Sequence, residues 1–397
     1  MDKFNLTHIK NKNFNADISD FSYESAKIVN NYHKSFDIYK VTPLVDLKNL
    51  ASELGIKGFF VKDESYRFGL NAFKVLGASY AMAKFIADKI GMDISKLTFD
   101  EITSETTRTK LGNLTFVTAT DGNHGRAVAW TANKLHQKSK IFMPKGSSLE
   151  RLENIRRENS DASIMDYNYD DCVRLAENYA RENRGVLIQD TSWENYEEIP
   201  KNIMKGYMTM ALEAYEELKE KDMLPSHIFL QAGVGSLATA ITGFFRNVMK
   251  EEAPKIIIVE ANKANCIYKT AKANDGKLHR VKGNLDSIMA GLNCGEVVSI
   301  GWPILKSYID YFISVDDFYS AIGMRVLGNT IGNDRKIISG ESGAVTSGVV
   351  YKLMTDESLK EYKEEIGLDK NSIVLCFSTE GDTDKLSYRK IVWEDKF

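Results

Sequence analysis

The residues best suited to chemistry in this chain are a lysine and, further along, a polar loop that contains glycine. Lys74 begins a stretch with helical spacing and is flanked by the apolar residues Phe73, Val75 and Leu76. An amine that is desolvated at the positive end of a helix becomes a nucleophile that can form a Schiff base with a carbonyl group. Because a single lysine is more often a surface residue, its interpretation depends on the loops that accompany it.

The polar loop runs from Thr118 to Gly125, between an expected strand, Leu114–Val117, and a helix expected from Arg126. A strand-to-helix turn exposes backbone N–H groups beside a positive helix end, which suits a phosphate or a carboxylate. The candidates in this loop for contact with a small substrate are Thr120, Asp121, Gly122, Asn123 and His124. An aspartate ahead of a glycine is also a common turn former, so a purely structural role stays open for Asp121.

A second glycine-containing turn, Gly233–Leu237, separates the expected strand His227–Leu230 from the helical stretch Ala238–Val248. This geometry suits a phosphate group. It also fits a dinucleotide-binding fingerprint, since Gly233-x-Gly235-x-x-Ala238 is followed by a strand that ends in Glu260. A nicotinamide-dependent dehydrogenase and a turn that binds nothing therefore remain alternatives at this point.

Short β-branched runs alternate with amphipathic helical stretches, which predicts an α/β fold with mostly parallel sheets. Such a fold brings the loops that follow its strands to one edge of a sheet, where ligands bind. The expected strands are Gly58–Val61, Leu114–Val117, Lys140–Met143, Ser163–Met165, Val186–Ile188, His227–Leu230, Lys255–Val259 and Ser372–Leu375, and the expected helices include Lys74–Ile90, Cys172–Asn183 and Ile203–Lys219.

Composition excludes several classes of function. With 52 basic and 55 acidic residues among 397, the net charge of −3 does not favour nucleic acid or an anionic membrane as partner. We expect no membrane span, no signal peptide and a cytoplasmic location, because the apolar runs are only strand-length. Four scattered cysteines predict reduced thiols, with a pairing of Cys266 and Cys294 left open, and no histidine spacing predicts a metal site.

Four motifs occur in one order: Lys74, Thr120–His124, Gly233–Leu237 and Ser378-Thr379-Glu380-Gly381. In this order the chain resembles the fold-type II pyridoxal-phosphate family, which includes threonine dehydratases, cysteine synthases and the tryptophan synthase β chain. The resemblance implies pyridoxal 5'-phosphate as cofactor, bound covalently to Lys74, with Asn123 near its phenolic oxygen. It also implies the following contacts: Gly233, Val234, Gly235, Ser236 and Leu237 to the phosphate, and Ser378 or Thr379 to the pyridine nitrogen.

The same resemblance implies two interwoven lobes and a homodimer. The expected large cofactor-binding lobe comprises residues 1–84 and 196–397, and the expected small lobe comprises residues 85–195. Another segment, Ser339–Gly343, resembles family segments around the cofactor ring and makes Glu341 a further site candidate. Its glycines are also compatible with a simple turn.

Two acidic residues depart from the common pattern and point to the substrate. Asp121 stands where ordinary dehydratases have a small uncharged residue, and Asp190 follows the expected strand Val186–Ile188. An ammonium group on the substrate's Cβ would gain a charge-assisted hydrogen bond of about 1.5–3 kcal/mol from such a carboxylate. A role for Asp190 as the N-cap of a helix over Thr191–Tyr196 stays open, because aspartate is a preferred cap.

The segments 119–126, 189–194 and 377–383 resemble members of the family that eliminate ammonia from 2,3-diaminopropionate, giving pyruvate and two ammonia. On this hypothesis Lys74 takes the α-proton of the L-isomer and Asp121 that of the D-isomer, while Asp190 holds or reprotonates the substrate. The alternatives are a serine or threonine ammonia-lyase, a β-replacing synthase and an amino acid sensor without turnover.

Overall fold

The computed structural model describes residues 3–10, 12–120, 122–283 and 285–397, so the predicted site residue Asp121 lies outside the described residues. The chain forms two compact units: unit 1 comprises residues 1–22, 41–66 and 210–397, and unit 2 comprises residues 23–40 and 67–209. The expected small lobe falls within unit 2, whose bounds are wider. The assignment of residues to functional lobes stays a prediction.

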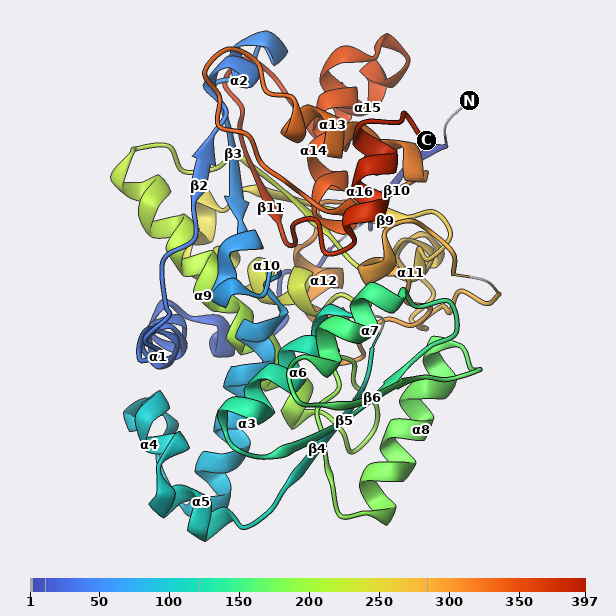
Figure 1. The fold of residues 1–397 in the computed structure, drawn as a ribbon. Helices are drawn as coiled ribbons and strands as arrows, with labels where there is room; N and C mark the ends of the chain where they lie inside the picture. The colour runs from blue at the N-terminus through green and yellow to red at the C-terminus, as the bar shows by residue number, and fades with distance from the viewer. Residues whose placement is uncertain (1–2, 11, 121, 284) are drawn as a thin grey trace. The chain divides into compact units, whose positions relative to one another are not determined.

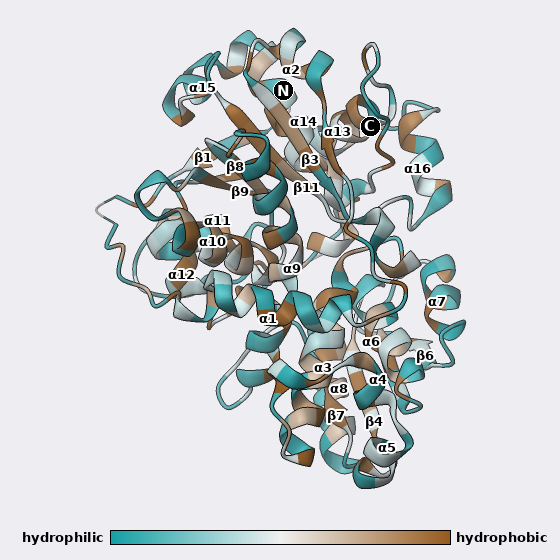
Figure 2. Cartoon of the chain, turned by 90° about the vertical axis from the view of Figure 1, so that its left-hand side faces the viewer, coloured by the Kyte–Doolittle hydropathy of each residue, from teal (hydrophilic) through white to brown (hydrophobic). Residues whose placement is uncertain are grey.

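Unit 1 is built on a sheet of seven strands in the order β1-β10-β9-β8-β11-β3-β2. The five inner strands are parallel, and the edge strands β1 and β2 are antiparallel to their neighbours. Every residue of β3, β8 and β11 is buried, as expected for strands covered on both faces, and Figure 2 shows the hydrophobic colour along these strands. The strands are β1 Phe4–Thr7, β2 Leu44–Asp46, β3 Gly58–Asp63, β8 His227–Gln231, β9 Lys255–Ala261, β10 Tyr311–Val315 and β11 Ile373–Ser378.

The helices of unit 1 fix the strands through one large apolar cluster, in which Val345 and Val349 pack with strand residues such as Phe229 and Cys376. Two of these helices approach each other so closely that a Cβ on Gly323 would lie 2.0 Å from the carbonyl oxygen of Ala344. Apart from short 3-10 turns, the helices of this unit are α2 Lys48–Leu54, α10 Ser236–Met249, α11 Cys266–Ala273, α12 Trp302–Tyr308, α13 Asp317–Gly328, α14 Glu341–Thr355, α15 Lys360–Ile366 and α16 Lys385–Val392, together with the second half of α9 Glu198–Glu220.

Unit 2 contains a four-stranded parallel sheet in the order β6-β5-β4-β7 (Figure 1). From β4 the chain moves outward to β5 and β6, and it then returns to form β7 on the other side of β4. The strand order therefore reverses between β4 and β7, and at such a switch point the loops after the strands form a ligand-binding crevice. The strands are β4 Thr115–Ala119, β5 Lys138–Met143, β6 Asp161–Ile164 and β7 Val186–Leu187, and the helices are α1 Tyr23–Lys34, α3 Lys74–Ile90, α4 Phe99–Thr103, α5 Glu105–Leu111, α6 Asn123–Lys134, α7 Leu149–Arg156, α8 Tyr169–Glu182 and the first half of α9.

The predicted α/β class with mostly parallel sheets is confirmed, and all eight expected strands are present within a few residues of their predicted bounds. Three further strands, β1, β2 and β10, were not predicted. The helix after the polar loop begins at Asn123 rather than Arg126. Cys266, whose pairing the sequence left open, is the first residue of α11. None of the described helices is long and apolar enough to cross a membrane.

Candidate active site

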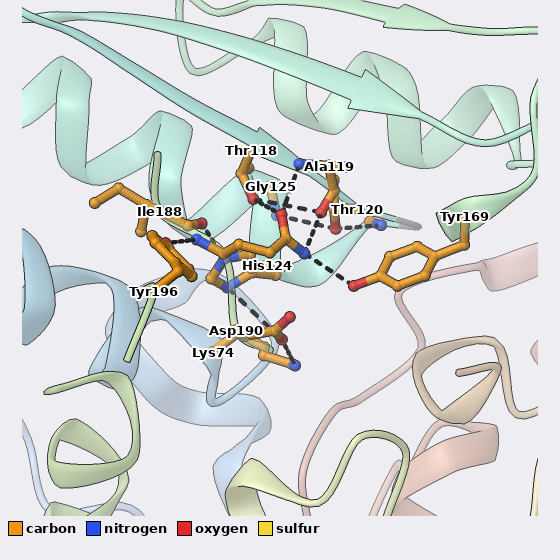
Figure 3. Close-up of polar contacts among 12 residues, drawn as sticks. Lys74, Thr118, Ala119, Thr120, His124, Gly125, Tyr169, Ile188, Asp190 and Tyr196 are labelled. Carbon is orange, nitrogen blue, oxygen red and sulfur yellow. Dashed lines mark hydrogen bonds and ion pairs between the residues drawn. The ribbon is translucent and has the colours of Figure 1, made fainter. Parts of the chain in front are cut away.

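Lys74 is the first residue of α3, and its side chain is 20% exposed. Its neighbours Val75 and Leu76 are buried, as the sequence predicted, and its Nζ lies 5.6 Å from the centre of the Phe73 ring. Nζ donates a hydrogen bond to Oδ2 of Asp190 (Figure 3). The fold thus brings together a lysine and an aspartate that are 116 positions apart in the chain.

Asp190 lies just beyond β7, at the switch point of the sheet, and is 5% exposed. Burial alone would disfavour its ionised form, but the positive charge of Lys74 and the hydrogen bond from Lys74 outweigh it. Together they lower the pKa of Asp190 to about 2. The carboxylate is therefore an anion at neutral pH. No helix follows it, so the N-cap interpretation of Asp190 is wrong.

The polar loop after β4 is held by its own side chains. Oγ1 of Thr120 accepts hydrogen bonds from the N–H groups of Gly122, at 3.0 Å, and Gly125, at 3.1 Å, and so fixes the start of α6. Gly125 is required here, because a Cβ would lie 2.2 Å from the Thr120 methyl group. His124 lies in the first turn of α6, is 3% exposed and bonds through Nε2 to the carbonyl oxygen of Ile188, at 2.7 Å.

Gln189, which the sequence did not single out, joins the two strand ends that carry these residues. Its Oε1 accepts bonds from Thr118 Oγ1 and Ala119 N–H, and its Nε2 donates to Ala119 O and Tyr169 OH, all within 2.9–3.1 Å. The hydroxyl of Tyr196 accepts from Gln189 N–H at 2.8 Å and donates to Leu187 O at 2.9 Å. These contacts hold the backbone before Asp190 against β4. The contacts of Gln189 with Thr118, Ala119 and Tyr169 follow no local pattern, because these partners lie in other segments.

Replacing Tyr196 with phenylalanine is expected to destabilise unit 2. The variant leaves the partly buried N–H of Gln189 and C=O of Leu187 without their hydroxyl partner. Each buried backbone group that loses its hydrogen bond costs about 1–3 kcal/mol. Urea titration of the Tyr196→Phe variant should show the loss, whereas Tyr167→Phe, at an exposed tyrosine of the same unit, should change stability by less than about 0.5 kcal/mol.

In unit 1, the turn after β8 has the backbone that a phosphate site needs. Gly235 adopts φ +106°, and a Cβ on Gly233 would lie 3.1 Å from Cys294 Sγ. Gly235 occupies the N-cap position of α10, so no side chain at that position caps the helix. A residue outside the turn fixes its backbone, because Val298 N–H donates a hydrogen bond to Val234 O at 2.8 Å. The turn thus leads into the positive end of a helix of 14 residues, which suits an anion.

Ser378 and Thr379 lie at the end of β11, next to β8 in the same parallel sheet. Both are buried, and Thr379 Oγ1 accepts from Nε2 of Gln231, the last residue of β8, at 2.9 Å. Ser378 Oγ donates to Ser339 Oγ at 2.8 Å. Unit 1 therefore brings the glycine turn and these two hydroxyl groups to one edge of its sheet.

Glu341 begins α14 and is buried, and its Oε1 accepts from Ser387 Oγ at 2.6 Å. This contact ties α14 to α16. The segment that carries Glu341 is therefore the start of a helix rather than a simple turn. The four cysteines are free thiols, and nowhere among the described residues do three His, Cys, Asp or Glu side chains form a metal-binding group.

Glu260, the candidate ribose-binding acid of a dehydrogenase, has a structural role instead. It is fully buried, and its two oxygens accept the backbone N–H groups of Ile267, at 3.0 Å, and Tyr268, at 2.6 Å, in the first turn of α11. Both oxygens are thus engaged by the helix, which argues against a ribose ligand. Burial raises the pKa of Glu260 to about 8, although these hydrogen bonds oppose the shift.

We expect Glu260→Gln to change how stability depends on pH. Because the folded-state pKa of about 8 exceeds the unfolded value of about 4.3, Glu260 contributes stability below pH 4 that is lost as pH rises towards 8. Relative to wild type, the glutamine variant should gain up to about 1.4 kcal/mol per pH unit across this window. Urea unfolding at about pH 6 and about pH 8 measures the difference. An equal stability difference at both pH values would contradict the assignment.

The comparisons with known proteins agree with this geometry. A family model described as pyridoxal-phosphate dependent enzyme matches residues 36–366. A diaminopropionate ammonia-lyase of Salmonella typhimurium is 49% identical over 92% of this chain and 91% of its own length, and one of Escherichia coli is 45% identical over 97% and 96%. A crystal structure of the Escherichia coli enzyme in complex with D-serine superposes with a TM-score of 0.93 at 43% identity, covering 100% of this chain and 98% of that one. The chain belongs to the fold-type II pyridoxal-phosphate-dependent enzymes, and within them to the family of the diaminopropionate ammonia-lyases.

Proposed function

We propose that the chain catalyses the pyridoxal-phosphate-dependent elimination of ammonia from 2,3-diaminopropionate, giving pyruvate and two ammonia. The observation that carries the proposal is the ion pair of Lys74 with the buried, anionic Asp190 at the switch point of a parallel sheet. A dehydratase of hydroxy amino acids has no use for an anion there, whereas a diamino acid brings a second ammonium group. The similarity to diaminopropionate ammonia-lyases over almost the whole chain supports the same substrate.

The residues present fit pyridoxal 5'-phosphate. Unit 2 would supply Lys74 as the amine that holds the cofactor, and Asn123 beside its phenolic oxygen. Unit 1 would supply the backbone of Gly233–Leu237 for the phosphate, and Ser378 or Thr379 for the pyridine nitrogen. The left-handed φ of Gly235 and its place at the N-cap of α10 support the phosphate assignment. When bound, the cofactor delocalises the negative charge that remains after an α-proton is removed.

Residues of the protein would bind the substrate and remove its α-proton. Lys74 would take the α-proton of the L-isomer, and Asp121 would take that of the D-isomer from the opposite face. Thr120, Gly122 and Asn123, which lie at the start of α6, would contact the substrate carboxylate. Asp190 would hold the β-ammonium group, which leaves as ammonia. The released 2-aminoacrylate then hydrolyses in water to pyruvate and a second ammonia.

Product analysis tests this function directly. Purified enzyme loaded with cofactor is given D- or L-2,3-diaminopropionate, L-serine or L-threonine in separate reactions, and oxo acid and ammonia are quantified. We expect two ammonia per pyruvate from diaminopropionate. Activity confined to serine or threonine, with one ammonia per oxo acid, would contradict the assigned substrate. Asp121→Asn should lower turnover of the D-isomer and spare the L-isomer.

We also propose a homodimer, which the family resemblance implies, and a cytoplasmic location, which the composition predicts. Sedimentation velocity of the purified protein measures the first of these properties. Fractionation of expressing cells measures the second.

A further inference from the structure

One buried side chain of unit 2 presents a hydrogen-bond acceptor that its described surroundings do not satisfy. His124 uses Nε2 to bond to Ile188 O at 2.7 Å. Because a carbonyl oxygen can only accept, Nε2 carries the ring proton, and Nδ1 of the neutral ring has a lone pair. Nδ1 is buried, and within the described part of the chain nothing donates to it. A buried polar atom of this kind calls for a partner that is not part of the protein.

This acceptor faces the candidate site. Nδ1 lies 4.0 Å from Asp190 Oδ2, and Figure 3 shows the His124 ring directed towards Asp190 and Lys74. Burial lowers the pKa of His124, Asp190 opposes this and Lys74 adds to it, so the ring is neutral at physiological pH. A neutral nitrogen lone pair and a carboxylate oxygen both accept hydrogen bonds, so neither can satisfy the other. An ammonium group, which has three donors, can satisfy both.

We propose that His124 Nδ1 and Asp190 together bind the β-ammonium group of the substrate and keep it protonated until it leaves. The inference rests on the proposed function and adds to it a residue that selects the leaving group. That an ammonium group fits against this carboxylate is supported by Lys74, whose Nζ bonds to Asp190.

The charge of the β-amine determines how readily its Cβ–N bond breaks. Removal of the α-proton leaves an electron pair that forms the second Cα–Cβ bond, and the pair of the Cβ–N bond stays with nitrogen. A protonated β-amine then departs as neutral ammonia, and neither His124 nor Asp190 has to supply a proton. An unprotonated β-amine would have to depart as an amide anion, which is a very poor leaving group. Two acceptors around the ammonium group therefore favour the reactive form.

The test compares two leaving groups in His124 variants. His124→Gln keeps an N–H donor for Ile188 O but lacks the acceptor at Nδ1, and His124→Asn keeps a carbonyl acceptor near that position. For His124→Gln, we expect kcat/KM to fall about 10- to 100-fold with 2,3-diaminopropionate, the effect of one charge-assisted hydrogen bond. With β-chloroalanine, whose chloride needs no proton, it should fall less than about 3-fold, and His124→Asn should recover part of the loss. Equal losses with both substrates, or no loss with either, would overturn the proposal.

A second measurement does not depend on turnover. In cofactor-free wild-type protein labelled with ¹⁵N-histidine, NMR should show His124 with Nε2 protonated and Nδ1 unprotonated at neutral pH. A ring protonated at Nδ1 would overturn the proposal, whatever the enzyme's activity. If instead wild-type enzyme fails to release two ammonia per pyruvate from diaminopropionate, the proposed function itself is wrong. The two failures are therefore distinguishable.

Discussion

Lys74→Ala is expected to abolish covalent attachment of pyridoxal phosphate and to lower the elimination rate by about 10³-fold or more, since the variant lacks both the attachment point and the base. The wild-type protein should be yellow and should retain the cofactor after treatment with borohydride. Mass spectrometry of the digested, reduced protein should find the cofactor on the peptide that contains Lys74. The variant should be colourless and unlabelled after the same treatment.

Two further variants test whether Lys74 acts through its amine or only through its positive charge. Lys74→Arg keeps a cation beside Asp190 but has no amine that can attach the cofactor, so it should be as inactive as Lys74→Ala. Lys134→Ala removes an exposed lysine at the end of α6 and should leave both cofactor and activity in place. Attachment of the cofactor to a lysine other than Lys74 in the wild-type protein would refute the assignment.

Asp190→Asn is expected to retain the bound cofactor but to lower kcat/KM for diaminopropionate by about 10²-fold or more. The amide is similar in size to the carboxylate but is neutral, so it loses the attraction for an ammonium group. In the wild-type protein the positive charge of Lys74 overcomes burial and lowers the pKa of Asp190 to about 2, so the carboxylate is an anion at neutral pH. Steady-state kinetics, with the cofactor absorbance recorded in parallel, measures both properties.

Asp166→Asn is a suitable control, because Asp166 is an exposed aspartate of the same unit and its Lys145 partner is also exposed. It should leave kcat/KM unchanged. Loss of the cofactor absorbance in Asp190→Asn would mean that Asp190 acts by holding Lys74 or the local backbone. Unchanged turnover of diaminopropionate would show that the carboxylate does not bind the substrate.

Much of this architecture follows from local sequence patterns. Buried parallel strands such as β8, β9 and β11 are continuous apolar runs, and α3 has the predicted bounds, because apolar periodicity and a terminal glycine specify a helix locally. The strands that were missed lie at a sheet edge or carry mixed residues. β2, for example, has only three residues, and pairing with β3 is what makes it a strand. Such pairing depends on tertiary contacts that no local pattern encodes.

The sequence by itself determined the α/β class, the order of the four motifs and Lys74 as the candidate nucleophile. Each strand, helix and motif could be recognised because it consists of residues that are near one another in the chain. Only the tertiary structure decided that Asp190 contacts Lys74 rather than capping a helix, and that Glu260 caps α11 rather than binding a ribose. It also decided which nitrogen of His124 carries the proton, through the carbonyl oxygen of Ile188. A side chain's charge and its protonated atom depend on the groups that surround it in space, and in this fold those groups come from distant segments.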